Sequence, residues 1–182
     1  MTLIPVTARP EGPPAFEPKT LAAGAGVFLA AGGSGREDKR IGVHYYKPER
    51  FTRESPTLLV LPGTGRNANT YRSFWMDAAE AYNVLIATLE YPEVDYDFGA
   101  YHMGGVIKNF RLRNVTLRPD GTLPSSLYIR DEDIEFEFNE RRETWLFHDF
   151  DRIFDILATA TDSARRKYDV FGHSAGGQIL HR

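Results

Sequence analysis

The 182-residue chain contains no cysteine. This absence excludes disulfide bonds, thiolate metal sites and a cysteine nucleophile, and it leaves the redox compartment open. No apolar run reaches the roughly 20 residues that a membrane-spanning helix needs, so no membrane span is predicted. The formal net charge is only −3. A charge this small argues against nucleic acid and anionic membranes as partners.

The sequence also lacks a convincing signal peptide and a calcium-loop motif. The apolar stretch 21–31 follows two glutamates and several prolines. This is a poor positively charged leader, so a buried strand and a cytoplasmic location are expected, with periplasm and secretion left open. The acidic run 131–133 lacks the glycine and spacing of a calcium loop and is interpreted as a solvated turn. Neither a metal nor a cofactor is therefore predicted.

What the chain does contain is a G-x-S-x-G motif between a short apolar strand and the start of a helix. Such a corner exposes the hydroxyl of its serine, here Ser174. Gly172 and Gly176 remove side chains that would collide at the corner, and His173 completes it. Such a motif also arises by chance, and glycine-rich turns after strands are ordinary loops. The flanking strand and helix favour a nucleophile elbow with Ser174 as the catalytic residue.

The remaining sequence alternates strand and helix signals, which is typical of an α/β fold. The proline-rich residues 1–19 are interpreted as an extended arm, and residues 20–182 as part of one domain. Hydrophobic periodicity predicts strands at 26–30, 40–46, 57–61, 84–89 and 168–171, and helices after residue 67 and over 143–161. The first two strands are expected to pair as an antiparallel hairpin, in which His44 is interpreted as structural.

Residues 92–139 interrupt this alternation and are predicted to leave the sheet as an excursion. They are rich in aromatic residues and include the turn Pro119-Asp120-Gly121. Long insertions of this kind often shape a binding mouth. The alternative is a surface decoration without a role in function.

The hairpin, the buried strands, the glycine-rich loop 62–67 and the elbow together resemble the α/β-hydrolase superfamily. Pro-Gly-Thr-Gly-Arg-Asn and Gly-His-Ser-Ala-Gly-Gly are most similar to esterases of the polyhydroxybutyrate depolymerase and feruloyl esterase type. That group often has His-Gly where this chain has Pro62-Gly63. The resemblance covers residues 26–182. It implies a mostly parallel sheet with an amino-terminal antiparallel hairpin, incomplete on its carboxy-terminal side.

The resemblance further implies a serine hydrolase that cleaves small or polymeric carboxylic esters through an acyl-enzyme on Ser174. The N–H group of Ala175 would be one oxyanion donor. The other would be the N–H group of Thr64 or of Gly65, in the loop after the earlier buried strand. Backbone donors suit this task because they need no reorganisation as negative charge develops.

The acid and the base of the expected triad are missing from the sequence. In this superfamily the triad follows the order serine, acid, histidine. The eight residues after Ser174 include no Asp or Glu, and His181 lies on the helix that leads away from the elbow. The chain is therefore expected to be an amino-terminal fragment, inactive alone, whose acid and histidine lie beyond Arg182.

Two other function classes fit parts of the sequence. Residues 63–68 match G-x-G-x-x-A between a strand and a helix, and Glu90 follows where a ribose-binding acid is expected. A dinucleotide-binding domain is therefore one alternative, although the preceding hairpin and Pro62 argue against it and the elbow stays unexplained. The second alternative is a hydrolase-like scaffold that binds a partner without catalysis.

Overall fold

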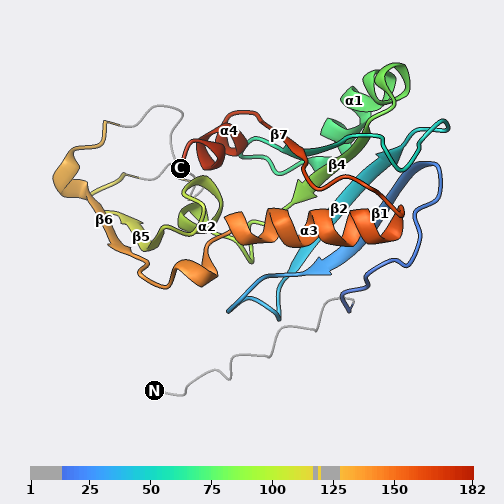
Figure 1. Cartoon of the computed structure of the whole chain (residues 1–182). Helices are drawn as coiled ribbons and strands as arrows, with labels where there is room; N and C mark the ends of the chain where they lie inside the picture. The colour runs from blue at the N-terminus through green and yellow to red at the C-terminus, as the bar shows by residue number, and fades with distance from the viewer. Residues whose placement is uncertain (1–13, 117–118, 120–127) are drawn as a thin grey trace.

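The computed structural model describes residues 14–116, 119 and 128–182 (Figure 1). Its centre is a five-stranded sheet with the strand order β1-β2-β4-β3-β7. The strands are β1 (Gly24–Ala31), β2 (Arg40–Lys47), β3 (Thr57–Leu61), β4 (Leu85–Glu90) and β7 (Asp169–Gly172). Each expected strand is present within two residues of its predicted ends.

The sheet combines an antiparallel hairpin with a parallel part. β1 pairs antiparallel with β2, and β2 pairs antiparallel with β4. β3 lies between β4 and β7 and is parallel to both. Of these five strands, β2 alone runs opposite to the others, so the expected mostly parallel sheet with its amino-terminal antiparallel hairpin is confirmed.

Helices cover both faces of this sheet (Figure 1). α1 (Ala68–Tyr82) packs on one face, where Ala79 meets Val60 and Ile86 in a small core. α3 (Phe147–Ala160) and α4 (Ala175–Leu180) contribute to the larger core on the other face. The apolar face of α3 that the 3.6-residue period predicts is buried, including Phe150, Ile153, Phe154 and Leu157.

Two details of the helices differ from the sequence predictions. The helix expected from residue 143 begins at Phe147, because residues 142–144 form a separate 3-10 turn and Leu146 N–H donates to the carbonyl of Gly104 (2.9 Å). Tyr82 continues the helical spacing of Ala68, Tyr71, Trp75 and Ala78, which predicts burial, but it is 78% exposed. The helix ends at Tyr82, and Asn83 follows in the left-handed conformation, so the ring points past the core.

The stretch 92–139 carries α2 (Phe98–His102), β5 (Ile107–Leu112) and β6 (Ile134–Phe138), with β5 and β6 paired antiparallel as a second sheet. α2 packs against both β5 and α4. One correction falls in the acidic run: Asp133 is buried rather than solvated, because it pairs with Arg130 (3.0 Å). None of the helices in the described part is long and apolar enough to cross a membrane.

Candidate active site

The predicted elbow is a sharp corner between β7 and α4. Gly172 ends the strand, Ala175 begins the helix, and Ser174 lies between them with φ 53° and ψ −116°. A positive φ is unfavourable for a residue with a side chain, so it persists only where surrounding structure enforces it. Ser174 is exposed to solvent. The structure therefore holds a strained backbone at a serine that a ligand can reach.

Close backbone packing enforces this strain. A Cβ atom on Gly172 would lie 2.3 Å from the carbonyl oxygen of Gly176, and one on Gly176 would lie 2.1 Å from that of Leu61. Both positions therefore exclude any side chain. The N–H group of His173 also donates to the carbonyl of Leu61 (3.2 Å). The corner is thus fixed against the end of β3.

The glycine-rich loop between β3 and α1 meets this corner at the same edge of the sheet. β3 and β7 are parallel neighbours with Leu61 in register with Gly172, so their carboxyl ends lie side by side. A Cβ atom built on Gly63 would be 3.4 Å from Cβ of Ser174. The two segments singled out from the sequence are therefore brought together.

The N–H groups of this loop differ in whether they donate a hydrogen bond within the described structure. The N–H group of Gly63 donates to the hydroxyl of Tyr71 (3.3 Å). Thr64 and Gly65 are exposed, and none of the described residues accepts a hydrogen bond from either N–H group. Two unused donors therefore lie directly after the glycine that touches Ser174.

Arg66 anchors the loop from behind. It is only 7% exposed, and its guanidinium donates to the carbonyls of Tyr91 (2.6 Å) and Tyr96 (2.9 Å). The same group stacks 4.0 Å from the ring centre of Tyr101, whose hydroxyl donates to the carbonyl of Pro62 (2.6 Å). Burial lowers the pKa of Arg66 and raises that of Tyr101. The loop is thereby tied to the start of the excursion.

Glu90, the acid expected to bind a ribose in the dinucleotide alternative, faces the sheet instead. Its carboxylate lies 2.6 Å from Nε2 of His44 on the neighbouring strand β2. This contact agrees with the structural role expected for His44. The geometry gives the dinucleotide alternative no support.

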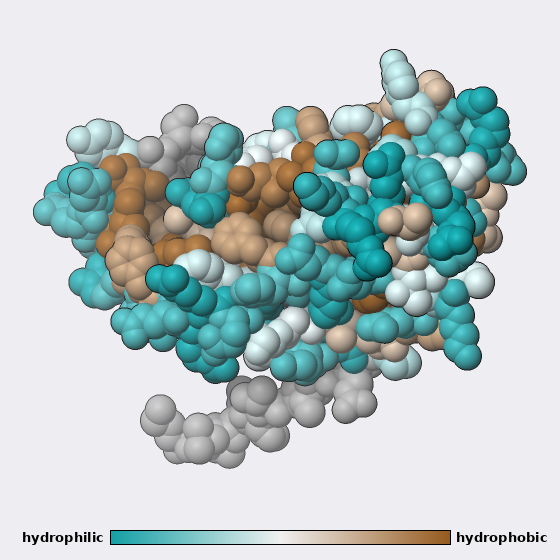
Figure 2. Space-filling model, viewed as in Figure 1, coloured by the Kyte–Doolittle hydropathy of each residue, from teal (hydrophilic) through white to brown (hydrophobic). Residues whose placement is uncertain are grey.

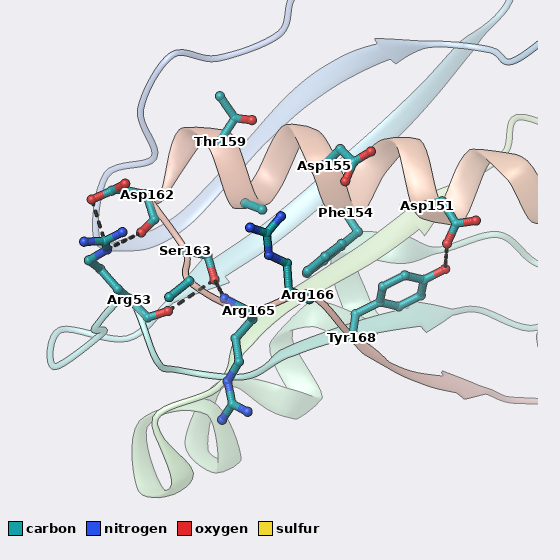
Figure 3. A pocket seen from close by; sticks show the side chains of 12 residues that line it. Arg53, Asp151, Phe154, Asp155, Thr159, Asp162, Ser163, Arg165, Arg166 and Tyr168 are labelled. Atoms are coloured by element: carbon teal, nitrogen blue, oxygen red, sulfur yellow. Dashed lines mark hydrogen bonds and ion pairs between the residues drawn. The ribbon is translucent and has the colours of Figure 1, made fainter.

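Two hollows lie along β7, at opposite ends of the strand. An apolar hollow of about 510 Å³ adjoins the elbow and is lined by Tyr71, Phe74, Trp75, Ala78, Phe171 and His173. The other, of about 860 Å³, lies beside Tyr168 where the strand starts (Figure 3). Figure 3 shows its charged lining, in which Tyr168 donates to Asp151 (2.6 Å) and Arg53 pairs with Asp162 (3.2 Å). Only the first hollow adjoins the candidate site.

Comparisons with known proteins identify the fold. No family model and no curated protein sequence matches the chain. Among solved structures, poly(aspartic acid) hydrolase-1 from Sphingomonas sp. KT-1 is 32% identical with a TM-score of 0.65, over 89% of this chain and 51% of that protein. LpqC, a poly(3-hydroxybutyrate) depolymerase from Bordetella parapertussis, is 23% identical with a TM-score of 0.63, over 88% of this chain and 46% of that protein. The chain folds as an α/β-hydrolase. It spans about half the length of these two structures.

The residues that hold the loop and the elbow together were not predicted from the sequence. Arg66 entered the prediction only as part of the glycine-rich loop 62–67, and no contact between Tyr71 and the elbow was predicted. The sequence feature that could have indicated a structural role for Arg66 is its position as a large charged residue inside a glycine-rich turn. Its partners Tyr91 and Tyr101 are too distant in sequence to be paired by a local pattern.

Proposed function

We propose that this chain carries the nucleophile and the oxyanion donors of a serine hydrolase that cleaves carboxylic esters. The observation that carries the proposal is the strained, exposed Ser174, with φ 53°, held beside a loop that has unused N–H groups. Strain of this kind persists where the surrounding structure enforces it, and it clusters at functional sites. The fold shared with a hydrolase that is 32% identical supports hydrolase activity in general.

In the proposed reaction, the Oγ atom of Ser174 attacks the carbonyl carbon of the ester, and its proton passes to a general base. The carbonyl oxygen becomes an oxyanion, which accepts hydrogen bonds from Ala175 N–H and from Thr64 N–H or Gly65 N–H. Collapse of this intermediate breaks the ester bond and leaves the acyl group on Ser174, while the alcohol takes up the proton. Water then attacks the acyl-enzyme in the same way. A general base and the acid that orients it complete such a triad.

The excursion 92–139 is proposed as one wall of the substrate site. α2 packs against α4, the helix that begins at the elbow. α2 also packs against β5, the first strand of the hairpin β5–β6. The hairpin exposes apolar side chains, including Phe136 and Phe138. Figure 2 shows apolar areas on this face of the molecule. Such a surface suits the apolar part of a small or polymeric ester.

Active-site labelling tests the nucleophile directly. A fluorophosphonate probe should label Ser174 in the full-length protein, as read by mass spectrometry of the labelled peptide. Ser174→Ala should abolish labelling and lower hydrolysis of p-nitrophenyl esters by about a thousandfold or more. Ser73→Ala, which changes an exposed serine on α1, is the matched control and should leave both unchanged. Labelling that persists in Ser174→Ala would remove the residue from this role. A folded protein with no labelling at all would favour a non-catalytic scaffold.

A further inference from the structure

The hydroxyl group of Tyr71 lies where the glycine-rich loop, the elbow and α1 meet. It is 2.6 Å from Nδ1 of His173 and 3.3 Å from the backbone nitrogen of Gly63. A Cβ atom built on Gly63 would be 3.4 Å from the Tyr71 hydroxyl, from Nδ1 of His173 and from Cβ of Ser174. One side-chain oxygen therefore bridges the two segments of the proposed site, directly beside the serine.

The hydrogen bond from the loop has a fixed direction. The backbone N–H of Gly63 can only donate, so the oxygen of Tyr71 accepts from it. The phenol oxygen keeps a second lone pair and one hydrogen, so its hydrogen bond with Nδ1 of His173 forms in either tautomer of the imidazole. In both tautomers a single phenol joins the loop to the elbow.

We infer that Tyr71 is a positioning residue that sets the spacing between the two sources of oxyanion donors. This inference rests on the function proposed above. By engaging Gly63 N–H, Tyr71 turns that donor away from the substrate and leaves the N–H groups of the next two loop residues free. By engaging His173, it fixes the residue that directly precedes the nucleophile. Tyr71 thus holds the loop donors at a set distance from Ala175 N–H.

The spacing matters because oxyanion donors act only near hydrogen-bond distance from the developing charge. A donor has to lie about 2.7–3.1 Å from the oxyanion position, and a misplacement of about 1 Å can cost a hundredfold in rate. Arg66 fixes the loop from the side of the excursion. Tyr71 is the contact on the side that faces the serine. Removing its hydroxyl should therefore loosen the transition-state contacts while leaving substrate binding intact.

The test compares Tyr71→Phe with Tyr46→Phe in the full-length protein. Both substitutions remove one phenol oxygen on the α1 side of the sheet, but Tyr46 donates to Glu80 (2.9 Å), away from the elbow. Tyr71→Phe should lower kcat for p-nitrophenyl esters about ten- to hundredfold, with KM changed less than about threefold. Tyr46→Phe should leave both constants within about twofold of the parent protein.

A double-mutant cycle with His173→Ala separates positioning from a general structural effect. If Tyr71 acts through His173, the double variant should be no slower than the slower single variant, whereas independent effects would multiply. Thermal unfolding checks that each variant is folded, and faster hydrogen exchange at the Gly63 amide in Tyr71→Phe would report the freed donor. An unchanged kcat in Tyr71→Phe overturns the inference even while Ser174→Ala remains inactive. An active Ser174→Ala protein would instead overturn the proposed function, so the two failures are distinguishable.

Discussion

At the scale of single residues, backbone conformation marks the candidate site more sharply than side-chain type. Six residues other than glycine have a positive φ in the described part of the chain: Arg66, Asn83, Asn109, Asn114, Asp162 and Ser174. Asn and Asp tolerate this region because their short polar side chains bond locally. The two exceptions are Arg66 and Ser174, one in each segment of the site. Among the described residues, positive φ angles at residue types that do not favour them therefore occur only in the loop and the elbow.

Two substitutions of Thr64 distinguish a role of its backbone N–H group from a role of its side chain. If its N–H group is an oxyanion donor, Thr64→Pro should lower kcat about a hundredfold or more, the usual loss for one donor, because proline has no N–H. Thr64→Ala keeps the N–H group and should change kcat less than about threefold. Steady-state kinetics on one ester checks both variants in the full-length protein.

Thermal unfolding of the same two variants supplies the control. Thr64 is exposed, so Thr64→Ala should leave the fold intact. Equal losses of kcat in both variants would assign the effect to the threonine side chain. A loss in Thr64→Pro that accompanies unfolding would move the donor role to the neighbouring Gly65.

Sequence patterns predicted the strand–turn–helix corner around Ser174 because its information is local. Gly172, Ser174 and Gly176 are neighbours in the chain, and the strain they share is a property of one turn. Tyr71 and His173, by contrast, are 102 positions apart, and their contact exists only once β3 and β7 are paired. No single-chain pattern marks such a pair, so the supports of the site had to come from the structure.

At the scale of elements, the hairpin β5–β6 has two chemically different faces. Lys108 pairs with Glu137 (3.5 Å), and Arg113 pairs with Glu135. Because side chains alternate along a strand, Phe136 and its apolar neighbours lie on the opposite face. Contact of this apolar face with substrate is part of the function proposed above.

Substitution of the apolar face tests this role. The double change Phe136→Ser and Phe138→Ser should lower kcat/KM for esters with long acyl chains about tenfold, and for acetate esters less than about threefold. Both rings are partly exposed, at 43% and 71%, so the free energy of unfolding should change by less than about 1 kcal/mol. The double change Lys108→Ser and Glu137→Ser on the charged face is the control. An unchanged rank order of esters in the aromatic variant would make the hairpin a decoration.

Element types followed from the sequence more readily than their surroundings did. The continuous apolar runs of β3 and β4 predicted buried parallel strands, and both are buried in the sheet. The burial of Asp149 could not be predicted from the sequence. Asp149 is completely buried on α3, and its ion-pair partner Arg36 (3.4 Å) comes from the distant loop between β1 and β2. Burial raises the pKa of Asp149, while Arg36 and Arg152 oppose that effect. Helical periodicity predicts which face of a helix is apolar, but it does not predict an ion pair with a residue of another element.

At the scale of the whole molecule, the site is assembled by strand order. The loop after β3 and the corner after β7 are separated by more than a hundred residues, yet they meet because the two strands are parallel neighbours. The excursion joins them from a third place, through the bond of Arg66 to the carbonyl of Tyr96 and through the contact of α2 with α4. The candidate site is therefore built from three separate parts of the sequence.

The three tyrosines around Arg66 also make the fold sensitive to alkali. Tyr91, Tyr96 and Tyr101 are fully buried, and burial raises the pKa of each phenol above its ordinary value near 10. The folded chain then keeps protons that the unfolded chain releases, so the contribution of these three phenols to the free energy of unfolding is constant below about pH 10 and falls above it. In an alkaline titration, the ultraviolet absorbance of tyrosinate should rise in a late step that coincides with the loss of circular dichroism. Ionisation that runs to completion with the dichroism unchanged would contradict this reading. The ultraviolet absorbance of tyrosinate therefore reports whether the three buried tyrosines are still packed around Arg66.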